Sequence, residues 1–333
     1  MAAQEEAEHA PPSASSPAHT SAATVDTDRN RPQTPAFAGP VREGPRLRVL
    51  GIAQDAGVPQ LGCRCARCER ARKDTASARY VASVGFTDGR GRVYLVDATP
   101  DLRAQVALVR DWLDEARQVA ARVRRPVDGI FLTHGHMGHY AGLLQLGFEA
   151  AHTDAVPVYG TGPMLELLRR NAPWRQLLDK GELDPREVVS GTAVSLGEIS
   201  VTPVAVPHRA EFTDTVGVKI DGPKRAVLYL PDVARWAEVA DMDALLRGVD
   251  VLLLDGTFYS GDELPGRDLS AIGHPLVVDS VERLTPQVRA GALRVIFVHL
   301  NHSNPLHDPD SAASRAVAAA GFEVATRGLE IAL

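Results

Sequence analysis

Short apolar runs recur from residue 47 to the end of the chain, and most of them end at a histidine, an aspartate, a glycine or a proline. Runs of this length, rich in Val, Ile and Leu and bounded by turn residues, predict buried β-strands. The pattern predicts strands over residues 47–53, 81–86, 93–97, 130–132, 156–159, 199–206, 215–220, 226–230, 249–254, 295–299 and 323–325.

Apolar residues at helical spacing lie between several of these strands. The pattern is clearest over residues 102–123, where Val106, Val109 and Leu113 fall on one face. Helices are also expected over residues 142–148, 163–171 and 311–320. Strands that alternate with helices predict a layered α/β fold. Residues 172–197 are polar and mixed, and we expect them to form part of a substrate rim.

The first 43 residues differ from the rest in composition. They are rich in Ala, Ser, Thr and Pro and contain almost nothing that a core would use. Such segments do not bury enough apolar surface to fold. We therefore expect a disordered tail over residues 1–43 and one domain over residues 44–333.

Composition excludes several classes of partner. The formal net charge is −6, and the one basic tract, residues 122–125, is short, which argues against nucleic acid as the main partner. No apolar run approaches the roughly 20 residues of a membrane span, and the N-terminus lacks a signal pattern. Three cysteines within six residues are not a disulfide framework. We expect a cytoplasmic protein; the sequence gives no indication of its oligomeric state.

Three histidines follow directly after one predicted strand. His134, His136 and His139 are separated by Gly135 and Gly138, and these glycines predict a tight bend rather than a helix. Neutral imidazole is the commonest protein ligand of zinc and also suits iron. The end of a strand is a rigid place from which to present ligands. The pattern therefore predicts a metal site, with solvent-exposed histidines on a glycine-rich loop as the alternative.

Three other predicted strands also end in residues of the metal-binding kind. These residues are His208, Asp232 and His299, and each follows an apolar run. Side chains at the same end of neighbouring strands converge in layered α/β proteins. We expect all three to meet the histidine loop around one centre.

A separate cluster of cysteines lies near the start of the domain. Cys63, Cys65 and Cys68 supply three thiolates that can surround one zinc ion, and a closed structural site needs a fourth ligand. Buried free cysteines are the alternative. The flanking Arg64 and Arg67 do not fit hydrophobic burial, and they favour thiolate over thiol.

The stretch from His134 to His139 resembles the His-x-His-x-Asp-His signature of the metallo-β-lactamase superfamily, preceded by its apolar strand and a threonine. The resemblance implies an α/β protein with a four-layer αββα sandwich, and one or two zinc or iron ions at the active site. This chain differs from the superfamily signature at position 138, where it has glycine and the superfamily has an aspartate that binds the second metal. The resemblance implies that the first metal is bound by His134, His136 and His208. It implies that the second metal is bound by His139 and His299, and that Asp232 binds both metals.

A second set of motifs narrows the resemblance. VYLVDATPDLRAQV, DVLLLDGTFYSGDEL, FVHLNHSNPLHDPDS, IGHPL and GLEIAL are similar to the family of pyrroloquinoline-quinone biosynthesis protein B. That family implies that Cys63, Cys65, Cys68 and His274 hold one structural zinc. Phosphodiesterases of phosphonate breakdown share this cysteine arrangement. The biosynthetic family has lost early histidines of the loop motif, whereas this chain keeps all three, which indicates a fuller metal centre.

Asp55 lies in the loop after the first strand, where superfamily members have a small glycine-rich turn beside the metals. We expect it to compensate for Gly138, as a ligand of the second metal or as the base that orients a metal-bound water. An Asx turn with its own backbone is the alternative.

Three functions fit these residues. The leading hypothesis is a metal-dependent hydrolase of an ester, amide, lactone or phosphodiester, since zinc lowers the pKa of bound water toward about 7. Its catalytic candidates are Asp232 and Asp55. The first alternative is an iron-dependent oxidation in pyrroloquinoline quinone biosynthesis, as the narrower resemblance implies. The second is a non-catalytic carrier of a quinone-like small molecule. The expected partner is a small-molecule or peptide-derived substrate.

Overall fold

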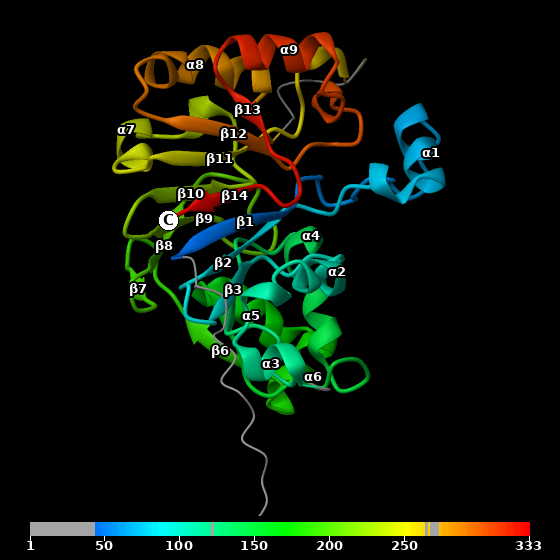
Figure 1. The fold of residues 1–333 in the computed structure, drawn as a ribbon, viewed down its shortest axis with the longest axis vertical. Coiled ribbons are helices and arrows are strands. Elements are labelled where there is room, and N and C mark those ends of the chain that lie inside the picture. The colour runs from blue at the N-terminus through cyan, green and yellow to red at the C-terminus, as the bar shows by residue number, and fades with distance from the viewer. Residues whose placement is uncertain (1–43, 121–122, 264–265, 267–272) are drawn as a thin grey trace, which may run out of the picture. The chain divides into compact units, whose positions relative to one another are not determined.

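Two β-sheets face each other in the computed structural model of the chain, which describes residues 44–333 apart from 121–122, 264–265 and 267–272 (Figure 1). The tail predicted over residues 1–43 lies outside the described residues. Among the described residues each sheet has seven strands. The first sheet has the order β14-β1-β2-β3-β4-β5-β6, with β1 Arg46–Gly51, β2 Ser83–Thr87, β3 Val93–Val96, β4 Gly129–Phe131, β5 Val156–Gly160, β6 Leu183–Glu187 and β14 Glu330–Ala332.

The second sheet has the order β13-β12-β11-β10-β9-β8-β7. Its strands are β7 Val194–Ser195, β8 Ser200–Ala205, β9 Val216–Asp221, β10 Ala226–Leu230, β11 Val251–Asp255, β12 Arg294–Val298 and β13 Glu323–Val324.

Helices cover the outer face of each sheet. The helices packed with the first sheet are α2 Leu102–Ala107, α5 Gly162–Arg170 and α6 Ala172–Asp179. Those packed with the second sheet are α7 Met242–Leu246, α8 Val277–Arg289 and α9 Ala312–Ala319. The remaining helices are α1 Ala66–Lys73, α3 Glu115–Val119 and α4 Met137–Tyr140. No helix in the described part of the chain is long and apolar enough to span a membrane.

The alternation of side chains along the strands explains the four layers. On β3, Tyr94 and Val96 pack between the two sheets, whereas Val93 and Leu95 pack under the helices of the first sheet. Successive side chains of a strand point to opposite faces, so a strand that is apolar at every position is buried on both. The α/β class and the αββα sandwich expected from the sequence are confirmed.

The direction of the strands determines where the site forms. β3, β4 and β5 are parallel neighbours in the first sheet, and β10, β11 and β12 are parallel neighbours in the second. Parallel neighbours end at the same edge of their sheet, where ligand sites of α/β proteins form. The loops that carry the candidate ligands leave from the ends of β4, β10 and β12.

Some predicted elements differ from the structure. The single helix expected over residues 102–123 is divided into α2, a 3₁₀ turn at Arg110–Trp112 and α3. Leu113 is extended, and the side chain of Asp114 accepts a hydrogen bond from the Arg117 backbone at 3.0 Å. An aspartate in this position starts a new helix, which the apolar period alone does not reveal.

Other differences concern short or weakly patterned elements. The segment 172–197, to which the sequence assigned no helix or strand, contains α6, β6 and β7. Residues 141–146 form a 3₁₀ helix rather than an α-helix. The sequence analysis assigned neither α8 nor the last strand β14, which pairs antiparallel with β1.

Candidate metal centre

The histidine loop bends immediately after β4. The backbone N–H of Gly135 donates to Thr213 Oγ1 at 2.8 Å, and a Cβ on Gly135 would lie 2.9 Å from Thr213 Cγ2. The close approach requires glycine here. A single helical turn, α4, then begins at Met137, so the loop is a bend followed by a turn of helix, not a bend throughout.

The first donor group consists of His134, His136 and His208, whose candidate ligand atoms all lie within 4.8 Å of one another. The ring centroids of His134 and His136 are 5.3 and 5.1 Å from that of His208. Burial lowers the pKa of His134 and lowers that of His208 to about 4. Both are therefore neutral imidazoles, the form that binds metals.

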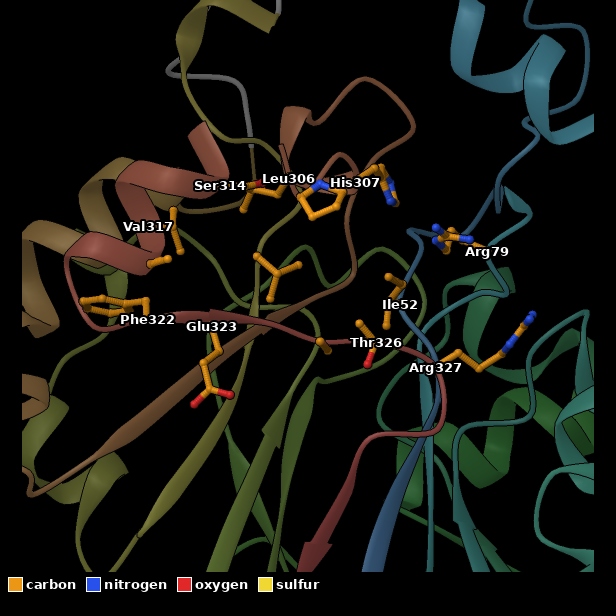
Figure 2. Close-up of a pocket in the computed structure, with 14 residues that line it drawn as sticks. Ile52, Arg79, Leu306, His307, Ser314, Val317, Phe322, Glu323, Thr326 and Arg327 are labelled. Atoms are coloured by element: carbon orange, nitrogen blue, oxygen red, sulfur yellow. The ribbon is translucent and has the colours of Figure 1, made fainter. Parts of the chain in front are cut away.

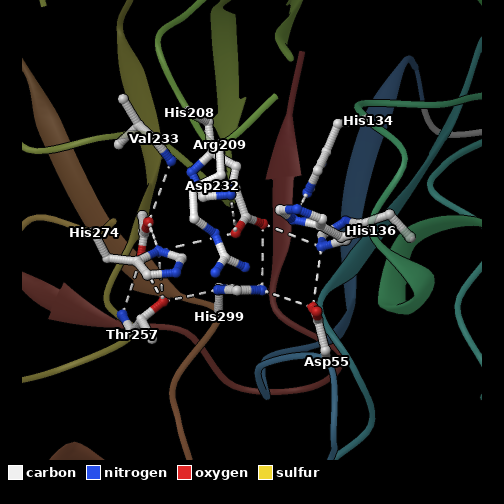
Figure 3. A network of polar contacts seen from close by, with 12 residues as sticks. Asp55, His134, His136, His208, Arg209, Asp232, Val233, Thr257, His274 and His299 are labelled. Carbon is white, nitrogen blue, oxygen red and sulfur yellow. Dashed lines mark hydrogen bonds and ion pairs between the residues drawn. The ribbon is translucent and has the colours of Figure 1, made fainter. Parts of the chain in front are cut away.

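The second donor group consists of His139, His299 and Asp55. The Asp55 carboxylate lies 3.2 Å from His139 Nε2 and 3.3 Å from His299 Nε2. Asp232 lies between the two groups: its Oδ2 is 3.1 Å from His139 Nε2, and its Oδ1 is 3.5 Å from His208 Nε2 (Figure 3). The structure brings together the residues that the sequence assigned to the two metal sites, and it places Asp55 beside His139 and His299.

Within the described part of the chain, four of these atoms are buried and make no hydrogen bond of normal geometry, although His139 Nε2 and Asp232 Oδ2 lie at ion-pair distance from each other. The four are His139 Nε2, both ring nitrogens of His208 and Asp232 Oδ2. Buried polar atoms in native proteins almost always make hydrogen bonds, so a cluster of buried atoms that do not needs an explanation. A metal ion is the partner that imidazole nitrogen and carboxylate oxygen share. The donor set therefore fits a metal.

Buried acidic groups orient the second donor group. His139 Nδ1 lies 2.7 Å from Asp97 Oδ2, and His299 Nδ1 lies 2.9 Å from Thr257 Oγ1, which donates to Asp255. Each histidine uses Nδ1–H in this contact, which leaves the Nε2 lone pair for the centre. Burial opposes protonation of His139, but Asp97 and Asp232 outweigh it and hold its pKa above the ordinary value.

Two residues in this network of hydrogen bonds have a strained backbone conformation. Asp97 has φ of 70° and His299 has φ of 59°, both in the left-handed region that non-glycine residues rarely adopt. Strain of this kind persists where the surrounding structure determines a functional geometry. Asp97 also accepts hydrogen bonds from Thr133 N and Oγ1, at 2.9 and 3.0 Å, which fixes the start of the histidine loop.

His274 lies at the histidine centre and not at the cysteines. Its Nδ1 is 2.7 Å from Asp255 Oδ2 and 3.9 Å from Asp232 Oδ1, and its ring centroid is 5.2 Å from that of His208. Burial opposes protonation, but Asp255 raises the pKa of His274 to about 9. The sequence analysis missed this residue as a member of the centre, because it assigned His274 to the structural zinc.

The fourth residue of the cysteine cluster is His302. Its Nδ1 lies 3.5, 3.7 and 3.9 Å from the sulfurs of Cys63, Cys65 and Cys68. The expected set of three cysteines and His274 is therefore wrong in its last member. Burial opposes ionisation of Cys65, but the hydrogen bond to the Cys68 backbone and that to His302 lower its pKa to about 6. We call these four residues the clasp.

The fourth residue could not be assigned from the sequence because it depends on a contact between distant segments. A bridge pairs Ala53 with Leu300, so the end of β12 runs beside the end of β1. The clasp loop leaves β1 just beyond that bridge, and His302 is two residues past Leu300. Spacing in the sequence does not reveal His302 as the fourth residue, because its position depends on the bridge between Ala53 and Leu300.

Residues at the mouth of the centre are polar and aromatic. Glu211 Oε2 lies 3.3 Å from His136 Nε2, and the Phe212 ring is 6.4 Å from the His136 ring. Arg209 packs over Gly273, next to His274. The segment that borders the first donor group is therefore 209–213, which the sequence analysis did not name.

Comparison with known proteins agrees with this geometry. Residues 92–300 match the model of the beta-lactamase superfamily domain. Coenzyme PQQ synthesis protein B of Xanthomonas campestris pv. campestris (strain B100) is 28% identical over 310 residues, covering 86% of this chain and 100% of the relative. The protein of the same name from Methylobacterium nodulans is 30% identical over 308 residues, covering 86% and 99%.

Solved structures give the same result. Zn(2+)-bound PqqB from Methylobacterium extorquens has a TM-score of 0.72 at 26% identity, covering 86% of this chain and 100% of that one. A diphosphatase from the PhnP family has a TM-score of 0.61 at 24% identity, covering 86% and 96%. The short form of human tRNase Z has a TM-score of 0.53 at 13% identity, and the match covers 86% of this chain and 98% of that chain. The last two similarities concern the fold alone.

Proposed function

The chain belongs to the beta-lactamase superfamily and is PqqB-like, and from this premise we propose that it is a metal-dependent enzyme that acts on a small or peptide-derived precursor in the synthesis of coenzyme PQQ. One observation carries the proposal: candidate ligand atoms of His134, His139 and Asp232 are buried within 4.8 Å of one another. Similarity over nearly the full length of relatives named for that synthesis supports the pathway.

Two donor groups would hold the metal ions, with Asp232 between them: His134, His136 and His208 in the first, and His139, His299 and Asp55 in the second. Zinc in these groups would supply an activated water and a Lewis acid, whereas iron would supply redox chemistry with dioxygen. The clasp would hold a separate structural zinc, since four protein donors leave no open position.

Hydrolysis is the reaction that the arrangement of the protein's own groups supports best. Asp55 and Asp232 direct carboxylates at the same histidines, so either can accept a proton from an attacking water. His274 lies beside Asp232, and its Nδ1 is held by Asp255. Its Nε2 is therefore the nitrogen available to give a proton to a leaving group.

An iron-dependent oxidation is the second candidate, and one specific observation favours it. The second donor group, His139, His299 and Asp55, is a set of two histidines and one carboxylate. Sets of this kind with open positions are typical of non-haem iron oxygenases. The names of the full-length relatives refer to coenzyme synthesis and not to hydrolysis.

Two measurements test the proposal. In the first, the chain is expressed in a bacterium that lacks its own coenzyme PQQ synthesis protein B, and the amount of coenzyme PQQ produced is measured. The parent chain and the control variant His152→Asn, outside the centre, should restore production, and His134→Ala should not. Restoration by His134→Ala to the parent level would favour a carrier, and failure of the parent chain would reject the role in this synthesis.

The second measurement separates the two reactions. Protein purified without added metal is analysed for zinc and iron. Zinc above one ion per chain supports hydrolysis, because the clasp accounts for one zinc. Iron that is lost in His134→Ala or in His139→Ala supports oxidation. Zinc at one per chain with no iron in active protein would contradict both reactions.

A further inference from the structure

A hollow lies between α9, the edge strand β13 and the segment that precedes β2 (Figure 2). Its larger part encloses about 560 Å³, and an adjoining part of about 260 Å³ shares Arg79, His307 and Pro309 with it. None of the described residues that line either part belongs to the clasp or to the donor groups of the histidine centre. We call the two parts together the arginine cleft.

One end of the cleft is apolar. Ile52, Leu306, Val317, Phe322 and Ala325 line it, and each is at least 96% buried. Small-molecule sites are hollows of about 300–1,000 Å³ with mostly apolar walls and a few polar groups that fix orientation. The larger part of the cleft has this size and this lining.

The other end carries four arginines: Arg67, Arg70, Arg79 and Arg327. Figure 2 shows Arg79 and Arg327 on the same side of the larger hollow. Within the described part of the chain, no carboxylate lies in ion-pair distance of any of the four. Burial lowers the pKa of Arg79, and the neighbouring Arg327, Arg70 and Arg67 lower it further. Four cations gathered in one place produce a local positive potential that attracts anions.

The acidic groups nearest the cleft are already engaged elsewhere. Glu323 pairs with Arg294 at 2.7 Å, outside the basic end. Asp74 accepts a hydrogen bond from Ser77 Oγ at 2.8 Å, and Asp308 accepts one from the Asp310 backbone at 3.0 Å. Asp74 offsets part of the positive charge of Arg70 and Arg79, but in the described structure none of these three carboxylates forms an ion pair with an arginine of the cleft.

His307 adds a polar group at the junction of the two parts. Its side chain is 91% buried, Nε2 donates to the Asn301 carbonyl at 3.1 Å, and Nδ1 has no hydrogen-bond partner. Figure 2 shows the ring at the border of the hollow. His307 lines both parts of the cleft, but its Nδ1 is enclosed by the protein and does not reach a ligand there.

We propose that the arginine cleft binds a small organic anion, with the acidic group among the arginines and an apolar body between α9 and β13. A carboxylate and a phosphate ester share this chemistry, because arginine forms bidentate hydrogen bonds with both. The site is separate from the histidine centre, so the proposal goes beyond the proposed function and does not depend on it.

A fluorescence titration of the full chain with 1-anilinonaphthalene-8-sulfonate tests the cleft, since this probe has an aromatic body, an N–H and an acidic group. Arg70 and Arg327 are exposed. The double variant Arg70→Gln/Arg327→Gln should bind the probe about tenfold more weakly, as expected for lost charged hydrogen bonds. Arg186→Gln is the matched control, because Arg186 pairs only with its neighbour Asp184 in the described structure.

A second pair of variants tests the apolar end. Ala318 and Ala316 are both exposed on α9, but only Ala318 lines the cleft. Ala318→Phe should fill the hollow and abolish probe binding, whereas Ala316→Phe should bind as the parent does. Similar affinities in both variants, or an equal loss in both, would overturn the proposal.

Competition identifies the acidic group. Displacement of the probe by octanoate indicates a carboxylate ligand, and displacement by 1-naphthyl phosphate indicates a phosphate ester. Inorganic phosphate alone should not displace it, because it has no apolar body. Displacement by neither organic anion, or loss of binding in His134→Ala, would place the probe elsewhere and reject the cleft as its site.

Discussion

The carboxylate of Asp55 fills the space into which a side chain at position 138 would project. A Cβ built on Gly138 would lie 2.6 Å from Cγ and 2.8 Å from Cα of Asp55, closer than real Cβ atoms approach. The same carboxylate lies 3.2 Å from His139 Nε2. The loop after β1 thus presents a carboxylate to the second donor group at the place where the superfamily motif would present one from position 138.

This relationship predicts a compensating exchange of residues. Gly138→Asp alone should lose about 1–3 kcal/mol of stability, because the added side chain overpacks against Asp55. Asp55→Gly alone should lose metal from the second donor group. The double variant Asp55→Gly/Gly138→Asp should recover metal binding and part of the stability, because one carboxylate again faces His139 while the close contact with Cα of residue 55 remains. Urea unfolding and metal analysis of all four proteins measure the coupling.

The control for this exchange is the clasp, whose zinc should be equal in all four proteins. A double variant that is no better than the worse single variant would show that the two positions do not share one role. Equal metal content in Asp55→Gly and the parent would show that Asp55 does not hold metal.

The central strands and the histidine centre could be predicted because their signals are local. An apolar run followed at once by His134, His208, Asp232 or His299 reports both a buried strand and the residue at its end. Parallel pairing of β10, β11 and β12 then brings Asp232 and His299 to the same edge of the second sheet, whereas His208 follows β8, which pairs antiparallel with β9. Asp55 could be predicted for a similar reason, since it lies in the loop that follows β1.

The elements that sequence reasoning missed depend on contacts between distant segments. Residue type alone does not show whether His274 or His302 is the fourth residue of the clasp. The bridge between Ala53 and Leu300 brings His302 to the cysteines. β14 is a three-residue strand whose pairing with β1 spans almost the whole domain. Neither apolar period nor residue spacing encodes such a register.

The clasp leads to a prediction about zinc and folding. His302→Ala should lose the clasp zinc and melt at a lower temperature, because structural zinc contributes directly to folding free energy. Cys65→Ser should behave in the same way. His274→Ala should keep this zinc, since His274 lies beside Asp255 instead. Zinc analysis and thermal unfolding of the three variants test the assignment, and zinc loss in His274→Ala with retention in His302→Ala would reverse it.

Asp97 predicts an effect on metal affinity from a residue that binds no metal. Its carboxylate lies 2.7 Å from His139 Nδ1 and accepts hydrogen bonds from Thr133. Asp97→Asn should lower metal affinity about 10–100-fold, since partners of this kind orient and polarise metal-binding histidines. Asp128→Asn is a suitable control, because Asp128 also accepts from a backbone N–H, that of Val93, away from the centre. Metal affinity unchanged in Asp97→Asn, or reduced equally in the control, would argue against this role.

His307 predicts how stability depends on pH. Burial, followed by the nearby Arg67, lowers its pKa to about 3 from an ordinary value of 6.5. The unfolded chain therefore binds a proton at this residue below pH 6.5, whereas the folded chain does not. Stability from this group is fully present above about pH 6.5 and falls as the pH drops toward 3, by at most about 1.4 kcal/mol per pH unit. His307→Gln removes the titrating group, so its free energy of unfolding should fall less steeply than that of the parent between pH 6.5 and 4. Urea unfolding at several pH values gives both slopes, and equal slopes would mean that His307 takes up a proton in the folded protein as readily as in the unfolded chain.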